Sequence, residues 1–161
     1  MPITVGQKLP DATFKIMTDG KPAEVSVKDY FAGKTVALFA VPGAYTPTCH
    51  NKHVPSFLAD GDKLKKAGVD TIACTSVNDI FVLDQWAKDT GAHGKIAFLA
   101  DGSAEFARAI GMELDLGGFG LGVRSKRYAM LVKDGVVKAL NVEENAGECT
   151  ISAAPALLKA L

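Results

Sequence analysis

Apolar residues gather in short blocks along the chain, and polar or glycine-containing stretches separate the blocks. Residues 35–41 (Thr-Val-Ala-Leu-Phe-Ala-Val) are apolar at both even and odd positions and rich in β-branched side chains. Such a block is typical of a strand buried on both faces of a sheet. Residues 69–77 and 96–100 have the same character. Residues 128–132 and 136–140 flank an Asp-Gly turn, which predicts a β-hairpin.

Segments with helical spacing lie between these predicted strands. The predicted helices cover residues 46–58, 60–67, 79–90, 103–110 and 152–161. Asn78 or Asp79 is expected to cap the third helix and Ser103 the fourth, and glycines end the second and third. Alternating helices and buried strands with a late hairpin predict an α/β fold, a three-layer sandwich with a mixed central sheet flanked by helices. A thioredoxin-like topology fits this order, and residues 1–161 contain no linker, so a single domain is expected.

Composition and charge exclude several classes of protein. The 161 residues are 48% hydrophobic, and 18 Lys and Arg balance 18 Asp and Glu, so disorder and a nucleic-acid partner are not expected. The longest apolar run is much shorter than the roughly 20 residues of a membrane span. Cys49, Cys74 and Cys149 have no paired spacing, and the amino terminus does not resemble a secretory signal. A reducing, cytoplasmic location is therefore expected.

Cys49 is the candidate nucleophile. Thr46 is a suitable N-cap and Pro47 suits the first helical position, so Cys49 falls in the first turn of a helix that follows a buried strand. Unpaired backbone N–H groups and the helix dipole favour a thiolate there. A helix end contributes only about 0.3–1 kcal/mol, less than the roughly 1.4 kcal/mol of one pKa unit. A cation from elsewhere is therefore required, and Arg124 and Arg127 are the candidates.

The run at 42–49, Pro-Gly-Ala-Tyr-Thr-Pro-Thr-Cys, resembles the Pro-x-x-x-Thr-x-x-Cys active-site signature of the peroxiredoxins. The full run is most similar to the atypical type II group, which includes mammalian peroxiredoxin five and the plant type II enzymes. Further matches at 76–79, around Trp86, at 124–128 and at 134–141 extend the resemblance over nearly the whole chain. It implies a thiol peroxidase for hydrogen peroxide and alkyl hydroperoxides, with no metal, haem, flavin or nicotinamide bound.

The resemblance also implies a role for each matched residue. Cys49 is expected to be the peroxidatic cysteine, which attacks the peroxide and becomes a sulfenic acid. Thr46 is expected to hold the thiolate and orient the peroxide, and Pro42 to shield the sulfur from water. Arg127 is expected to stabilise the thiolate and the charge on the leaving oxygen, with Arg124 as the second choice.

The other two cysteines bear on how the oxidised sulfur is reduced. Cys74 lies in a predicted buried strand and is first a core residue, although it matches a second cysteine of relatives. Cys149 is expected to be more accessible. Mammalian relatives carry a resolving cysteine in this region, but Ile151 stands at the matching position, two residues after Cys149. The expected cycle therefore uses one cysteine, with glutathione and glutaredoxin as reductant and thioredoxin as the alternative.

Several rival interpretations of Cys49 remain. It could be a small buried residue without chemistry. A Cys-His hydrolase or a zinc site would use His50 and His53, but no orienting group or fourth ligand is recognisable, so both histidines are predicted to be solvated. A dithiol reductase would carry Cys-x-x-Cys, whereas Thr46 stands three positions before Cys49. A non-enzymatic peroxide sensor shares the first chemical step and stays open as the alternative.

The glycine-rich run at 117–122 does not follow a predicted strand or open a helix, which argues against a dinucleotide-binding loop. A mobile or tightly turned surface loop is predicted instead. Phe119, Leu121 and Tyr45 would then be exposed near the active site, and by resemblance to type II relatives they could form the face of a homodimer. The aromatic residues predicted to lie in the core are Trp86, Phe81 and Phe106.

Overall fold

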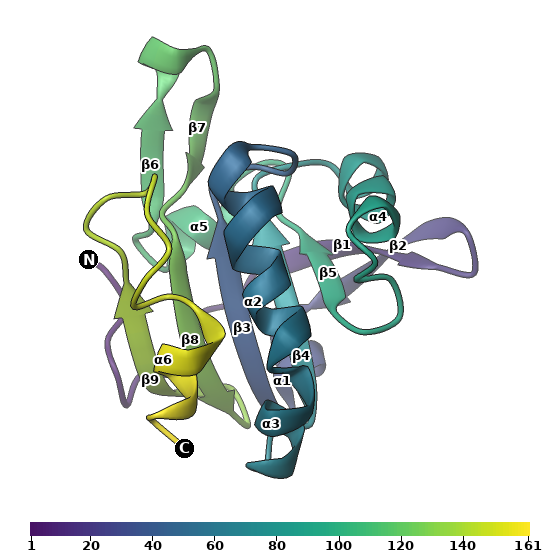
Figure 1. The fold of residues 1–161 in the computed structure, drawn as a ribbon. Coiled ribbons are helices and arrows are strands. Elements are labelled where there is room, and N and C mark those ends of the chain that lie inside the picture. The colour runs from purple at the N-terminus through teal and green to yellow at the C-terminus, as the bar shows by residue number, and fades with distance from the viewer.

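A seven-stranded mixed sheet forms the centre of the computed structural model, which describes residues 1–161 (Figure 1). The strand order is β2-β1-β5-β4-β3-β8-β9. The central strands β3, β4 and β5 are parallel, and their outer neighbours pair antiparallel. The strands are β1 (Thr13–Thr18), β2 (Lys21–Ser26), β3 (Thr35–Val41), β4 (Thr71–Ser76), β5 (Ala97–Ala100), β8 (Tyr128–Lys133) and β9 (Val136–Val142).

Helices cover both faces of this sheet, with α2, α3, α4 and α6 on one side and α1 and α5 on the other (Figure 1). Each face has its own apolar cluster, one around Phe57 and Trp86 and the other around Phe14 and Phe106. The helical elements are α1 (Val27–Phe31), η1 (Cys49–His53), α2 (Val54–Ala59), α3 (Gly61–Lys66), α4 (Ile80–Asp89), α5 (Glu105–Ala109) and α6 (Ala154–Leu158). The predicted thioredoxin-like sandwich is confirmed.

The position of β3 in the middle of the sheet explains why residues 35–41 are apolar at both even and odd positions. Phe39 and its alternate neighbours pack into one cluster, while Leu38 and its alternate neighbours pack into the other. Side chains of a strand alternate between the two faces of a sheet, so a strand covered on both sides needs apolar residues throughout. The predicted hairpin at the other end of the chain is also present as β8 and β9, joined by Asp134 and Gly135 in left-handed conformations.

The structure corrects the start of the fourth predicted helix. α5 begins at Glu105, and its N-cap is Ala104 in a left-handed conformation rather than Ser103. The carboxylate of Asp101 accepts hydrogen bonds from the amides of Phe106 and Ala107, both at 2.9 Å, and so satisfies the free N–H groups of the first turn. The last helix is also shorter than predicted.

Helix α4 corrects one of the predicted core residues. Its buried face carries Ile80, Leu83 and Trp86, which follow helical spacing. Phe81 lies outside that face and is 65% exposed, so its predicted core position is wrong. Trp86 and Phe106 are fully buried, as predicted. No helix in the structure combines the length and apolar character needed to cross a bilayer.

The sequence pattern did not predict the first hairpin, β1 with β2, or a second two-stranded sheet. That second sheet pairs β6 (Glu113–Leu116) with β7 (Gly122–Ser125) through a short helical turn, η2 (Gly117–Phe119). It projects beyond the main sheet (Figure 1). Gly120 and Gly122 have φ values of 74° and 66°, a region that favours glycine, so the tightly turned loop predicted here is present.

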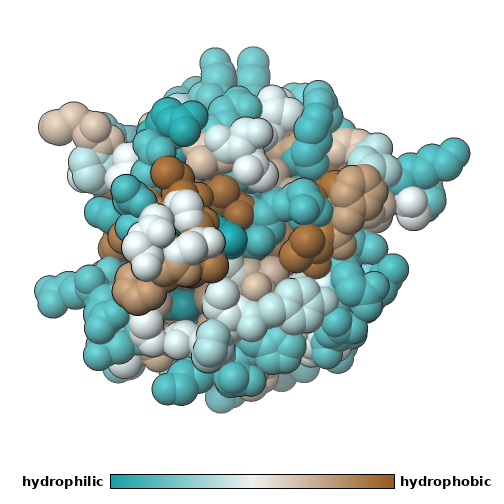
Figure 2. Space-filling view, turned by 90° about the horizontal axis from the view of Figure 1, so that it is seen from above, coloured by the Kyte–Doolittle hydropathy of each residue, from teal (hydrophilic) through white to brown (hydrophobic).

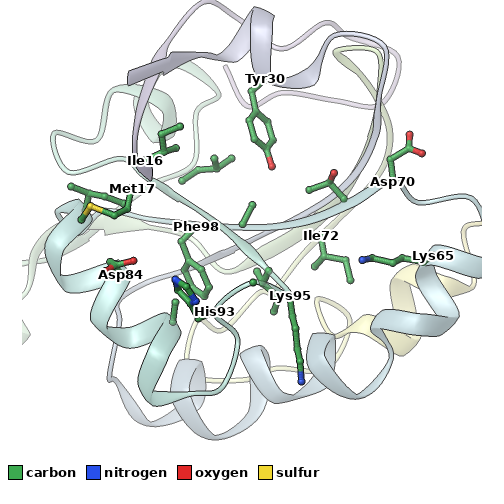
Figure 3. Close-up of a pocket in the computed structure, with 17 residues that line it drawn as sticks. Ile16, Met17, Tyr30, Lys65, Asp70, Ile72, Asp84, His93, Lys95 and Phe98 are labelled. Carbon is green, nitrogen blue, oxygen red and sulfur yellow. The ribbon is translucent and has the colours of Figure 1, made fainter. Parts of the chain in front are cut away.

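A cavity of about 430 Å³ opens beside the place where β1 and β5 part. The two strands pair only at Lys15 and Ala100. Met17 and Phe98 lie at its walls, and Tyr30 reaches it from α1 (Figure 3). None of the candidate catalytic residues lines this cavity, so it is separate from the site around Cys49.

Candidate active site

Cys49 lies in the first helical turn after β3 and is fully buried. The helix begins at Pro47, and the carbonyl of Thr46 accepts the N–H of His50 at 2.9 Å, so the predicted N-cap position is correct. The turn from Cys49 to His53 is π-helical and runs directly into α2. Both ends of this turn, Cys49 and His53, are buried.

Two polar groups contact the sulfur of Cys49. Thr46 Oγ1 lies 2.9 Å from Sγ and Arg127 Nη2 lies 3.0 Å from it. Thr46 Oγ1 is also 2.7 Å from the carbonyl oxygen of Gly43. A hydroxyl has one proton, so it serves one of these acceptors at a time. Thr46 can accept from a thiol while donating to Gly43, and it can turn its proton to the sulfur of a thiolate.

The guanidinium of Arg127 is held by three different acceptors. Nε donates to the carbonyl of Ala146 at 2.9 Å, Nη1 donates to His53 Nδ1 at 3.0 Å, and Nη2 donates to Cys49 Sγ. Arg127 is only 2% exposed and forms no ion pair with a carboxylate. An arginine stays protonated in proteins, and a buried charge is costly without a partner. Of the three acceptors of this guanidinium, only the sulfur of Cys49 is a group that can become an anion.

Arg124, the second candidate cation, does not contact the sulfur. Its Nε donates to the carbonyl of Leu121 at 2.8 Å, and its Nη1 donates to that of Pro42 at 3.3 Å. A Cβ added to Gly43 would lie 2.8 Å from the same Nη1. Arg124 therefore ties the β6–β7 hairpin to the buried Pro42 loop that precedes Cys49, and only one of the two arginines reaches the nucleophile.

His53 is a site residue that the sequence reasoning placed wrongly. It is fully buried, and its Nδ1 must accept because Arg127 can only donate. The proton of the neutral ring is then on Nε2, which donates to the carbonyl of Ser152 at 2.9 Å. Burial, together with the charge of Arg127, lowers the pKa of His53 to about 3. His50 is half-buried and accepts a hydrogen bond from Trp86 Nε1 at 3.0 Å, so neither histidine is a fully solvated helix residue.

Glu143 lies just after β9 and organises the irregular segment that follows it. Its carboxylate accepts from the amides of Thr150 and Ser152 at 2.7 and 2.8 Å and from their hydroxyls at 3.0 and 2.5 Å. Burial alone would raise the pKa of Glu143, but these four hydrogen bonds lower it below its usual value. Glu143 N also donates to the carbonyl of Arg127 at 2.9 Å. The same segment is tied to the helix start, since Thr48 Oγ1 donates to Gly147 O at 2.7 Å.

Neither of the other cysteines has the surroundings of Cys49, and all three are free thiols. Cys74 lies in β4 opposite Phe39, fully buried as predicted, and burial raises the pKa of its thiol well above the usual range. Cys149 is half-buried, and burial also raises its pKa. The structure thus places Cys149 as the most accessible of the three. No group of three metal-binding side chains is clustered in the structure.

A hollow of about 540 Å³ borders Thr46 and Arg127. Leu116, Phe119 and Leu121 from the β6–β7 hairpin form its apolar wall. Apolar side chains gather on this end of the molecule, which Figure 2 views from above. Phe119 is 81% and Tyr45 46% exposed, as the sequence predicted, while Leu121 is half-buried.

Comparisons with known proteins identify the family of this chain. The Redoxin family profile matches residues 4–158. The chloroplastic peroxiredoxin-2E of Arabidopsis thaliana is 51% identical, over 99% of this chain and 69% of its own length. Reduced Prx3 of Vibrio vulnificus, solved in complex with hydrogen peroxide, is 47% identical over 98% of both chains, with a TM-score of 0.93. Peroxiredoxin 5 of Alvinella pompejana is 37% identical over 99% of this chain and 97% of its own, with a TM-score of 0.86. The chain therefore belongs to the Redoxin family, as a peroxiredoxin of the type II, peroxiredoxin-5-like group, whose activity is that of a thiol peroxidase.

Proposed function

We propose that Cys49 is the peroxidatic residue of this thiol peroxidase and that it reduces hydrogen peroxide and alkyl hydroperoxides. One observation carries the proposal: a buried sulfur lies 2.9 Å from a hydroxyl and 3.0 Å from a guanidinium that has no carboxylate partner. A group of this kind favours a thiolate and offers donors to a developing oxygen anion. Pro42, buried in the preceding loop, shields the sulfur in this proposal.

The first step is a displacement at oxygen. The Cys49 thiolate attacks the protonated oxygen of the peroxide, a sulfur–oxygen bond forms, and the oxygen–oxygen bond breaks. The sulfur is oxidised by two electrons to a sulfenic acid, and the leaving oxygen departs as an anion that takes a proton from water. Arg127 stabilises that anion as it forms, and Thr46 directs the incoming peroxide towards the sulfur.

Glutathione is the proposed reductant of the sulfenic acid. Its thiol displaces water to give a mixed disulfide between Cys49 and glutathione. The dithiol of glutaredoxin then reduces this disulfide, which returns Cys49 to the thiol and releases glutathione, and glutaredoxin is itself oxidised to a disulfide. Thioredoxin is the second choice. Support for a one-cysteine cycle comes from the surroundings of the other thiols. Cys74 is fully buried in β4, and the raised pKa of Cys149 keeps its thiol protonated at neutral pH. Neither cysteine is therefore a good nucleophile towards the sulfenic acid of Cys49.

A homodimer is the proposed working form. Its face would be formed by Phe119, Leu121 and Tyr45, of which Phe119 and Tyr45 are exposed and Leu121 is half-buried. Residues 1–161 would act as one domain, because the helices on both sides pack on the same sheet. We also propose a cytoplasmic location, because the three cysteines are odd in number and have no paired spacing in the sequence.

Steady-state peroxide consumption tests the function. Wild-type protein is expected to turn over many times with glutathione and glutaredoxin, and a Cys149→Ser variant is expected to keep that activity. Cys49→Ser is the matched control and is expected to consume nothing. Loss of all turnover in Cys149→Ser, with the first oxidation intact, would contradict the one-cysteine cycle. A single stoichiometric burst with every reductant would identify a peroxide sensor instead of an enzyme.

A further inference from the structure

Hydrogen bonds connect Glu143 to the nucleophile through Ser152, His53 and Arg127. The Glu143 carboxylate accepts from the amide and hydroxyl of Ser152 at 2.8 and 2.5 Å. The carbonyl of Ser152 accepts from His53 Nε2 at 2.9 Å, His53 Nδ1 accepts from Arg127 at 3.0 Å, and Arg127 donates to Cys49 at 3.0 Å. All five residues are buried, and the most exposed of them, Glu143, shows only 7% of its surface.

Each hydrogen bond in this chain has only one possible direction. Arg127 has no acceptor, so it must donate to both Cys49 and His53. The single proton of the neutral imidazole is therefore on the side of Ser152, and Ser152 in turn donates to Glu143. The bonds from Arg127 to His53 and from His53 to the Ser152 carbonyl are aligned through the imidazole ring, and aligned hydrogen bonds strengthen one another in a water-poor interior. Arg127 and the Ser152 carbonyl together fix one tautomer of His53, and the Glu143 carboxylate holds Ser152 where its carbonyl reaches the ring.

The chain begins in a segment with no regular structure of its own. Residues 144–153 form bends and turns rather than a helix or strand. Four donors from Thr150 and Ser152 converge on the Glu143 carboxylate, and they fold the segment so that the Ser152 carbonyl faces His53. The segment also supplies the Ala146 carbonyl to Arg127. Two of the three acceptors of the Arg127 guanidinium therefore depend on the conformation of this segment. The Ala146 carbonyl belongs to the segment, and His53 is hydrogen-bonded to the Ser152 carbonyl in it.

We propose that Glu143 is a positioning residue for the chemistry at Cys49, acting through Ser152 and His53 on the guanidinium of Arg127. Glu143 makes no contact with the sulfur, and its effect is to keep Arg127 Nη2 at hydrogen-bond distance from it. This proposal rests on the proposed role of Cys49. A displacement of about 1 Å at a reacting group can cost on the order of a hundredfold in rate, so a remote anchor can matter.

Glu143→Gln tests this role, with Glu144→Gln as the matched control because Glu144 is adjacent and exposed. The readout is the pH dependence of Cys49 alkylation by iodoacetamide, followed on the peptide that contains it. In Glu143→Gln we expect the midpoint of this profile to rise by about half to one pH unit and the peroxide rate constant to fall on the order of tenfold. Glu144→Gln should match the wild type in both.

A double-mutant comparison separates positioning from general destabilisation. In an Arg127→Gln background, Glu143→Gln should cause no further shift of the alkylation midpoint, because no guanidinium is left to position. An equal shift in both backgrounds would overturn the proposal, and so would an unchanged midpoint in folded Glu143→Gln. If Glu143→Gln does not fold, Ser152→Ala removes only the hydroxyl donor and is expected to give a smaller shift in the same direction; no shift would overturn the proposal.

The test of the positioning role can be read independently of the test of the proposed function. The alkylation profile reports on Cys49 without any peroxide. A wild-type protein that did not react with peroxide would contradict the proposed function, while a shifted alkylation midpoint in Glu143→Gln would still support the positioning role.

Discussion

Acid is expected to destabilise the folded protein through His53. The folded state holds this ring neutral, with its pKa lowered from 6.5 to about 3, whereas the unfolded chain takes up a proton near pH 6.5. The unfolded state therefore binds more protons between these values, and the stability contributed by His53 is fully present above pH 6.5 and declines as the pH falls. One proton corresponds to about 1.4 kcal/mol per pH unit, so the loss approaches about 2.7 kcal/mol at pH 4.5.

Urea unfolding from pH 7.5 to 4.5 measures this effect. His53→Gln removes the titrating ring, and His93→Gln is the matched control because His93 is exposed. Since His53→Gln also loses buried hydrogen bonds, it should be less stable than the wild type at pH 7.5, but the difference should narrow by about 2–3 kcal/mol at pH 4.5. Because the pKa of Glu143 is lowered, the stability that this carboxylate contributes is lost only as the pH falls below its usual pKa of 4.5. That loss lies below the pH range of this experiment. A difference that did not change with pH would refute the reasoning.

Four substitutions test the contacts around the sulfur and in the core. Thr46→Val removes the hydroxyl that lies 2.9 Å from Cys49, and stopped-flow oxidation should slow roughly a hundredfold, the usual cost of losing one oriented donor; a loss below threefold would contradict the role of Thr46. Arg124→Met should slow the same reaction much less than Arg127→Met, because only Arg127 reaches the sulfur; equal losses would mean that the two cations share the role. Cys74→Ser should lower the free energy of unfolding by about 1–3 kcal/mol in urea titrations, through an unpaired buried hydroxyl, and leave the peroxide rate unchanged; a lost peroxide rate would contradict a purely structural Cys74.

The position of the candidate nucleophile in the first turn of a helix could be predicted because the residues that determine it are local in the sequence. An N-cap threonine, a first-turn proline and a cysteine at the third helical position can be recognised without tertiary contacts, and the structure has this arrangement at Thr46, Pro47 and Cys49. The fold was predictable for the same reason, since doubly covered strands such as β3 carry an unbroken apolar signal.

The missed features depend on contacts between distant parts of the chain. β2 lies at the edge of the sheet and none of its residues is fully buried, so its sequence, with Pro22 inside it, carries little strand signal. His53 is buried by the segment that contains Ser152, nearly one hundred residues later, and nothing in its local sequence indicates that partner. Phe81 is different: the spacing of Ile80, Leu83 and Trp86 places it off the buried face, so attention to helical period would have predicted its exposure.

Locating the sulfenic acid tests the central claim most directly. One equivalent of hydrogen peroxide is added to the reduced protein in the presence of dimedone, which traps sulfenic acids, and the peptides are identified by mass spectrometry. The arrangement of Cys49 between Thr46 and Arg127 predicts one adduct per chain, on Cys49, and a much slower reaction in Arg127→Gln. An adduct on Cys149 or Cys74, or an equally fast reaction without the guanidinium, would contradict it.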